Sequence, residues 1–136
     1  MYDSKILYRP KDADKLKDLH PDLARVIYRA AQDGARFIVI ETMRGRAKQN
    51  AAFKSGHSKA IFGKWPHNFA PALAVDIGPT NYPGVIPDYR KLSILIKAAA
   101  IEERVKITWG GDFKSIFDPP HFELSDWKNL RGKLAD

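Results

Sequence analysis

Apolar and polar residues follow two periods along this chain, one typical of helices and the other typical of strands. Apolar residues spaced three and four positions apart predict helices over residues 12–19, 21–33, 47–55 and 88–103. β-Branched runs and alternation predict strands over residues 36–42, 72–77, 106–109 and 121–124. We expect an irregular arm or edge strand over residues 1–10 and a long, functional loop over residues 57–71.

Several residues mark where the helices begin and end. Asp12 is expected to cap the first helix, and Pro21 suits the first turn of the second, so His20 is interpreted as a helix-start residue rather than a metal ligand. Gly34 and Gly56 are expected to end the second and third helices. The side chains predicted to face the core from the longer helices are Leu23, Val26, Ile27, Ala30, Ala51, Ala52, Phe53, Leu92, Leu95, Ile96 and Ala99.

The length and composition fit one globular domain over residues 1–136. Of these residues 44% are hydrophobic, none is cysteine, and no apolar run is long enough to cross a membrane. The net charge is +7, but the basic residues are spread along the chain rather than gathered on one helix face. Such a surface keeps a protein soluble or attracts a polyanion, either nucleic acid or an anionic bacterial cell wall.

Two histidines and an aspartate are the candidate metal ligands. Alternation in the 72–77 strand places Asp76 on the same face as two alanines, which leaves open space in front of its carboxylate. His67 precedes this strand in the loop, and His121 begins the last strand. Two imidazoles and a carboxylate can hold zinc with a fourth position for water, although each residue alone has an ordinary structural explanation.

A carboxylate next to such a site suggests a metal-assisted hydrolase. Asp118 is the candidate general base, because the two prolines between it and His121 form a stiff bend that fixes their relative positions. Asp112 and Glu123 are competitors for this role. Glu123 alternates to the same face as His121, so it could instead fix the imidazole.

Other polar and aromatic residues leave alternatives open. Arg44 and Arg46 are either a solvated pair or include a guanidinium that binds a substrate carboxylate or stabilises an oxyanion. His57 is interpreted as facing solvent and Trp109 as part of the core, whereas Trp65 fits either the core or a binding surface.

The order of these motifs resembles the zinc D-Ala-D-Ala carboxypeptidase and L-alanyl-D-glutamate endopeptidase family, which shares its fold with the Hedgehog signalling domain. The resemblance is greatest to phage-encoded endolysins of the L-alanyl-D-glutamate class. It covers residues 19–125, and the matching segments are HPDLARVIYRA, Thr42-Met43-Arg44 with Gln49, Phe53 and Gly56-His57-Ser58, HNFAPALAVDIGP, ITWGGDF and DPPHFEL.

The resemblance implies a role for each of six residues. It makes His67, Asp76 and His121 the zinc ligands and Asp118 the catalytic base. Arg44 falls on an arginine that stabilises the oxyanion or holds substrate, and Ser58 falls on a position that lines the substrate cleft. One departure is that His67 and Asp76 are nine positions apart, where many members have seven, as if the loop near Ala70 and Pro71 were expanded by two residues.

We therefore expect an α+β domain with a small, mostly antiparallel sheet, helices packed on one side, and zinc at the open face. The expected function is zinc-dependent hydrolysis of the L-alanyl-D-glutamate bond in the peptidoglycan stem peptide, leading to wall lysis. The alternatives are a D,D-carboxypeptidase that removes terminal D-Ala, a non-catalytic Hedgehog-like zinc-binding module, and a basic nucleic-acid-binding domain, which the scattered charge disfavours.

The resemblance also implies where the protein acts. The N-terminus lacks the pattern of a secretory signal, so we expect synthesis in the cytoplasm of a bacterial host and release to the cell wall through a holin-type pore. The expected partner is peptidoglycan, bound by a monomer without a separate wall-binding domain and without nucleic acid.

Overall fold

The computed structural model describes residues 2–136 as an α+β fold built on a four-stranded antiparallel sheet. Its strands are β1 (Ile38–Glu41), β3 (Ala74–Gly78), β5 (His121–Leu124) and β4 (Ile107–Trp109), in that spatial order. A two-stranded sheet joins β2 (Phe69–Ala70) to β6 (Lys133–Leu134). The helices are α1 (Ala13–Leu16), α2 (Pro21–Gln32), α3 (Arg46–Ser55) and α4 (Ile86–Glu103). The four strands and four helices predicted from the sequence are confirmed.

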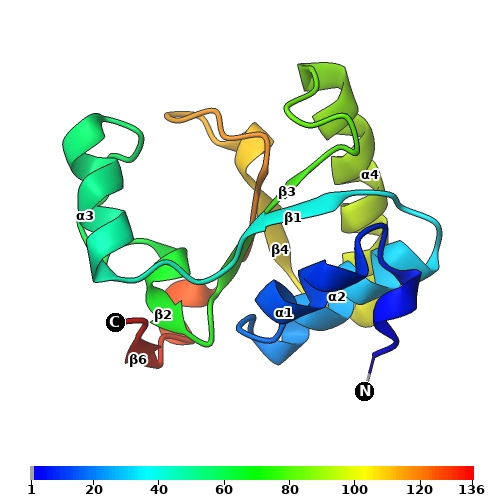
Figure 1. The fold of residues 1–136 in the computed structure, drawn as a ribbon, viewed down its shortest axis with the longest axis horizontal. Coiled ribbons are helices and arrows are strands. Elements are labelled where there is room, and N and C mark those ends of the chain that lie inside the picture. The colour runs from blue at the N-terminus through cyan, green and yellow to red at the C-terminus, as the bar shows by residue number, and fades with distance from the viewer. Residues whose placement is uncertain (1) are drawn as a thin grey trace.

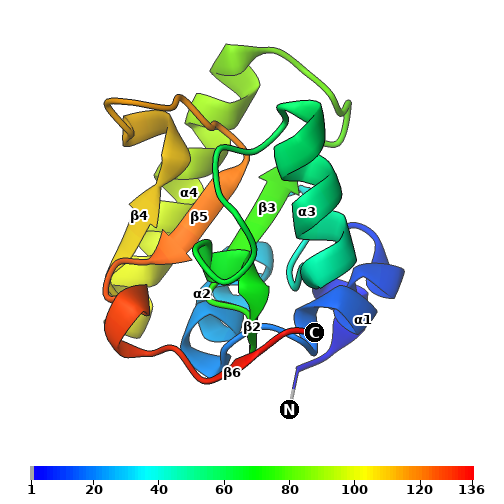
Figure 2. The ribbon, with the colours of Figure 1, turned by 90° about the vertical axis from the view of Figure 1, so that its left-hand side faces the viewer.

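The hydrophobic core lies between the sheet and the two longest helices. Helices α2 and α4 contact each other and lie behind the sheet in Figure 2. Leu23 and Ile27 of α2, Ile96 of α4 and Val75 and Ile77 of β3 are fully buried, as their periodicity predicted. Because strand side chains alternate between faces, the same arrangement turns Asp76 toward the opposite, open face of the sheet.

Helix α3 differs from the other three helices. It lies on the opposite side of the sheet from α1, α2 and α4, so the prediction that all helices pack on one side is correct only for those three (Figure 1). The predicted inward face of α3 is also wrong, because Ala51 is exposed and Phe53 is 48% exposed, whereas Gln49 is the buried residue of this helix. A buried amide requires hydrogen-bond partners, and those partners belong to the site described below.

Three smaller expectations are wrong. Asp12 does not cap α1 with its side chain; it is buried and accepts hydrogen bonds from Arg9 and from the backbone N–H of Val39. Leu95 of α4 is 46% exposed rather than in the core. The 57–71 segment is not a continuous loop, because it contains a short 3-10 helix at Pro66–Asn68 and strand β2.

Other predicted boundaries are confirmed. Pro21 occupies the first turn of α2, and His20 precedes it with Nδ1 accepting a hydrogen bond from the Asp22 N–H, as expected of a helix-start residue. Gly56 ends α3 in the left-handed conformation at φ 85°, which glycine adopts without steric cost. Among residues 2–136, none of the helices has the length and apolar character needed to span a bilayer.

Candidate metal centre

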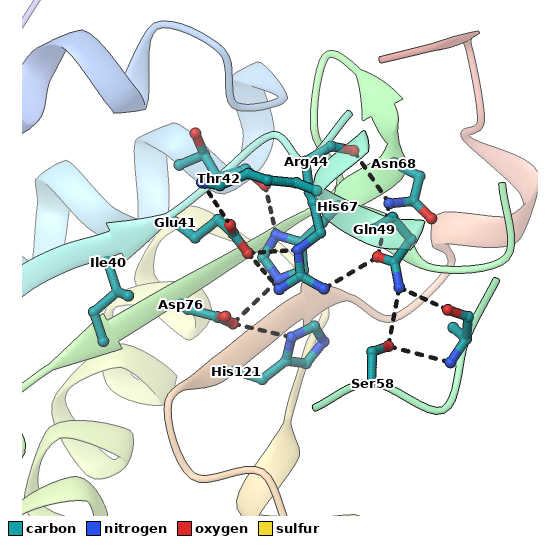
Figure 3. A network of polar contacts seen from close by, with 12 residues as sticks. Ile40, Glu41, Thr42, Arg44, Gln49, Ser58, His67, Asn68, Asp76 and His121 are labelled. Carbon is teal, nitrogen blue, oxygen red and sulfur yellow. Dashed lines mark hydrogen bonds and ion pairs between the residues drawn. The ribbon is translucent and has the colours of Figure 1, made fainter. Parts of the chain in front are cut away.

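Three side chains from different elements converge at the open face of the sheet. Asp76 of β3 and His121 of β5 are directly paired across the two antiparallel strands. His67 lies in the 3-10 helix Pro66–Asn68, which backbone hydrogen bonds from Arg44 to His67 (2.7 Å) and from Leu73 to Pro66 (3.0 Å) fix beside the sheet. Figure 3 shows both imidazoles directed at the Asp76 carboxylate.

The three potential ligand atoms have distances suited to a small cation. His67 Nε2 lies 3.1 Å and His121 Nδ1 lies 3.2 Å from Asp76 Oδ1, and all three ligand atoms are within 4.8 Å of one another. Ligand atoms bound tetrahedrally to zinc at ~2.0–2.1 Å lie about 3.3 Å apart. The nine-residue spacing between His67 and Asp76 therefore does not prevent the two side chains from meeting.

The second nitrogen of each imidazole, on the side away from Asp76, makes a hydrogen bond to the protein. His67 Nδ1 donates to the backbone carbonyl of Thr42, and His121 Nε2 donates to Glu123 Oε1 at 2.7 Å. Because a carbonyl and a carboxylate only accept, the proton sits on these outer nitrogens and leaves the inner lone pairs for a metal. This arrangement is characteristic of metal-ligating histidines, so the residues fit zinc, and it places Glu123 behind the imidazole rather than in the role of base.

The electrostatics of the metal-free site point the same way. Burial alone would raise the pKa of Asp76, but the imidazoles of His67 and His121 hold that pKa below its ordinary value. Burial would lower the pKa of His121, yet hydrogen bonds to Asp76 and Glu123 outweigh it and raise the pKa to about 9. The site thus favours positive charge between its ligands, which a metal ion supplies when it replaces the proton.

Asp118 lies at the edge of this ligand set, with Oδ2 4.0 Å from His121 Nδ1. Desolvation by burial, followed by the nearby Asp76 carboxylate, raises the pKa of Asp118. The bend that holds it is fixed by backbone hydrogen bonds from Asp118 to Gly110 (3.0 Å) and from Ile77 to Pro120 (2.9 Å). Asp112, one of the two competing candidates for the base, is exposed and pairs with Lys97 at 2.7 Å, so the structure does not place it in the site.

The Arg44 side chain is oriented by hydrogen bonds to two partners, the carboxylate of Glu41 and the amide of Gln49. Its Nε and Nη2 donate to Glu41 Oε1, and its Nη1 donates to Gln49 Oε1 at 3.1 Å. A guanidinium has five N–H donors, and three are used here, so two remain for a ligand. Arg46, by contrast, pairs with Asp136 at the surface and is not part of the site.

A buried pair of amides, Gln49 and Asn68, connects these parts and was not foreseen as a structural centre. Gln49 Nε2 donates to Ser58 Oγ (3.0 Å) and to the Ala60 carbonyl (2.7 Å), while Asn68 Nδ2 donates to Gln49 Oε1 at 3.0 Å (Figure 3). Both amides are fully buried, so these bonds are not exchanged for water. The sequence signal for these amides was that Gln49 and Asn68 both fall in segments that carry the family resemblance.

The ligand set opens into a cleft of about 570 Å³. Lining residues include Asp76, Asp118, Arg44 and Ser58, together with Ile116, Lys59 and Lys64. His57, expected to face solvent, is exposed and also lines this cleft.

The aromatic residues divide between site and core. Trp65 is stacked on the His121 ring at a centroid distance of 5.0 Å and lines the cleft, so it belongs to the site. Trp109 is 5% exposed and packs near Phe122 in the core, as expected.

Two comparisons with known proteins agree with this geometry. A family model described as D-alanyl-D-alanine carboxypeptidase matches residues 66–124, the stretch that contains all three candidate ligands and Asp118. The crystal structure of the Serratia marcescens L-Ala D-Glu endopeptidase ChiX is similar over 89% of this chain and 90% of that chain, with 28% sequence identity and a TM-score of 0.74. They confirm the predicted relation to the zinc D-Ala-D-Ala carboxypeptidase and L-Ala-D-Glu endopeptidase family, and the protein is a zinc metallopeptidase.

Proposed function

We propose that the protein hydrolyses an amide bond in the stem peptide of bacterial peptidoglycan, preferentially the L-alanyl-D-glutamate bond. The observation that supports this most is the convergence of His67, Asp76 and His121 at one point, where Asp76 lines a cleft together with Asp118 and Arg44. A structural metal site needs neither a carboxylate base nor an open approach, which disfavours a non-catalytic Hedgehog-like module.

In the proposed reaction His67 Nε2, Asp76 Oδ1 and His121 Nδ1 hold zinc. Bound zinc supplies a Lewis acid that polarises a carbonyl and makes water more acidic. Asp118 accepts a proton from the attacking water while the water oxygen bonds to the amide carbon. Arg44 donates its free N–H groups to the carbonyl oxygen as that oxygen gains negative charge. Asp118 then delivers the proton to the departing nitrogen as the C–N bond breaks, which returns the carboxylate to its starting state.

Ser58 is proposed as a substrate contact. Its hydroxyl oxygen lines the cleft and accepts hydrogen bonds from Gln49 Nε2 and from the Ala60 N–H at 3.1 Å. With two donors already directed at its oxygen, the hydroxyl proton is left to point at a substrate carbonyl or carboxylate.

The choice of endopeptidase over carboxypeptidase is supported by the similarity to the L-Ala D-Glu endopeptidase, which extends over nearly the whole of both chains. The family-model description favours the second candidate, a D,D-carboxypeptidase that removes terminal D-Ala. Digestion of purified sacculi followed by mass analysis separates the two. Fragments with a new D-Glu amino terminus support the endopeptidase, and loss of single D-Ala residues without such fragments supports the carboxypeptidase.

We also propose a biological role as a phage endolysin that acts as a monomer. The protein would be made in the host cytoplasm, reach the wall through a holin-type pore and be held there by its net charge of +7. Lysis of induced host cells with and without a co-expressed holin tests this role. Lysis that does not depend on the holin would argue against it.

A further inference from the structure

We infer that Lys59 and Lys64 form a carboxylate-binding subsite in the lining of the cleft, which selects peptides that carry an acidic group beyond the scissile amide. The inference rests on the proposed function and deepens it, because it concerns the substrate of the same cleft. Neither lysine belongs to the metal centre or to the groups proposed to move protons.

The first observation is where the positive charge lies. Arg44, Lys59 and Lys64 all line the cleft that contains Asp76 and Asp118. Arg44 already pairs with Glu41, and the Asp76 carboxylate is engaged by two imidazoles. Within residues 2–136, neither Lys59 nor Lys64 has an acidic partner within ion-pair distance. Among the basic side chains that line the cleft, Lys59 and Lys64 are therefore the two whose charge is not already paired with a carboxylate.

The second observation is that the buried side-chain amides of Gln49 and Asn68 hydrogen-bond to the backbone of the segment that carries both lysines. Gln49 Nε2 holds the Ala60 carbonyl at 2.7 Å, immediately after Lys59. Asn68 Oδ1 accepts from the backbone N–H groups of Gly63 (3.0 Å) and Trp65 (3.2 Å), on either side of Lys64. These hydrogen bonds fix the backbone on either side of both lysines relative to Asn68 and its neighbour His67.

The chemistry of the substrate supplies the matching group. Cleavage between L-alanine and D-glutamate leaves a carboxylate on the carbon bonded to the scissile nitrogen, and a diacid at the next position adds a second carboxylate. An ammonium pair attracts a carboxylate and repels an amine, so the subsite favours an acidic third residue over a lysine. The recognised group could be either of these two carboxylates. Converting one of them at a time to its amide shows which one the lysines bind.

The experiment is a double-mutant cycle between the lysines and the substrate carboxylates. Wild type and the variant with Lys59→Gln and Lys64→Gln are assayed on soluble stem peptides with both carboxylates free, or with one of them converted to the primary amide. Lys54→Gln is the matched control, because Lys54 is an exposed lysine of α3 outside the cleft lining. Zinc content and unfolding midpoint are measured for each protein.

The double variant is expected to lose about 3- to 10-fold in kcat/KM on the fully acidic peptide, the size of one or two ion pairs made by exposed lysines. It should lose little on the peptide whose recognised carboxylate is amidated, and that peptide identifies the source. Equal losses on all peptides, or no loss on any, would overturn the subsite while leaving the peptidase intact. If wild type cleaves none of the peptides, the proposed function fails, and the subsite fails with it.

Discussion

Asp76 and His121 face each other across two antiparallel strands, with Asp76 Oδ1 3.2 Å from His121 Nδ1. This pairing fixes the positions of two of the three candidate metal ligands by sheet register. A slip of one residue in either strand would turn one of the two side chains into the core, so the geometry of the site and the register of the sheet are a single feature.

Glu123 is predicted to set the affinity for zinc. Its carboxylate accepts from His121 Nε2 at 2.7 Å and holds the ring so that Nδ1 points at the metal position. Replacing Glu123 by Ala should weaken zinc binding about 10- to 100-fold, whereas Gln, which retains an acceptor oxygen, should cost less. Competition with a chromogenic chelator measures both. Equal affinities for wild type and the Ala variant would show that the ring is held by other contacts.

Zinc binding is predicted to release a proton at neutral pH. In the metal-free protein the pKa of His121 is raised to about 9, above its ordinary 6.5, so the imidazole is protonated at pH 7. A metal ligand must be deprotonated, and release should therefore be near one proton at pH 7 and diminish above pH 9. Calorimetry in buffers of different ionisation enthalpy measures it. A binding enthalpy independent of the buffer at pH 7 would contradict the assignment.

The same shift determines how the stability of the metal-free protein depends on pH. A raised folded-state pKa means that protonated His121 stabilises the fold fully below about pH 6.5, and that this contribution is lost as pH rises toward 9. Zinc-loaded protein should lack this loss, because the ion takes the place of the proton. Chemical unfolding of both forms across this range is the control for the calorimetry.

Gln49 is predicted to couple stability to activity. It is fully buried and bonds to Arg44, Ser58, Ala60 and Asn68, so Gln49→Leu would remove four hydrogen bonds around a buried position. We expect a loss of about 2–3 kcal/mol in the free energy of unfolding and a lower kcat/KM. Urea unfolding provides the first value, with Lys54→Ala as a surface control on the same helix. A change below about 0.5 kcal/mol, the range of surface substitutions, would mean that the network is not structural.

Gly110 is predicted to be needed for the position of Asp118. A Cβ on Gly110 would lie 2.1 Å from the Asp118 carbonyl oxygen, so Gly110→Ala must displace the bend that carries the proposed base. Activity should fall more than zinc content does. In Gly132→Ala the added Cβ meets only the Ala70 carbonyl oxygen at 3.4 Å, which makes this variant the control. Full activity in Gly110→Ala would indicate that Asp118 can be misplaced without consequence.

The strands and their ligands could be predicted because local patterns determine them. Alternation around Asp76 and the stiff bend before His121 are local, and both side chains lie where the pattern placed them. The placement of Glu123 behind His121 also follows from alternation. The convergence of His67 with these residues depends on tertiary contacts such as the hydrogen bond between Arg44 and His67, which no local pattern encodes.

The orientation of α3 could not be predicted from the sequence because the residue that this helix buries, Gln49, is polar. Apolar residues normally mark the inner face of a helix, but α3 is turned so that Gln49 faces inward and Phe53 faces solvent. The two-residue strand β6, which pairs with β2 next to His67, is too short to produce a period. Both features are contacts between distant segments, and both support the loop that carries the first ligand.

The most direct test of the zinc-peptidase mechanism compares the Asp118→Ala variant with wild type, measuring zinc content and hydrolysis of purified sacculi on the same samples. Asp112→Ala is the control, because it removes an exposed carboxylate outside the cleft. We predict that the Asp118 variant retains one zinc ion and loses at least about 100-fold in rate, the lower range for a general base. Hydrolysis at the wild-type rate by zinc-loaded Asp118→Ala would contradict the assignment of the base, and wild-type protein that binds no zinc would contradict the site itself.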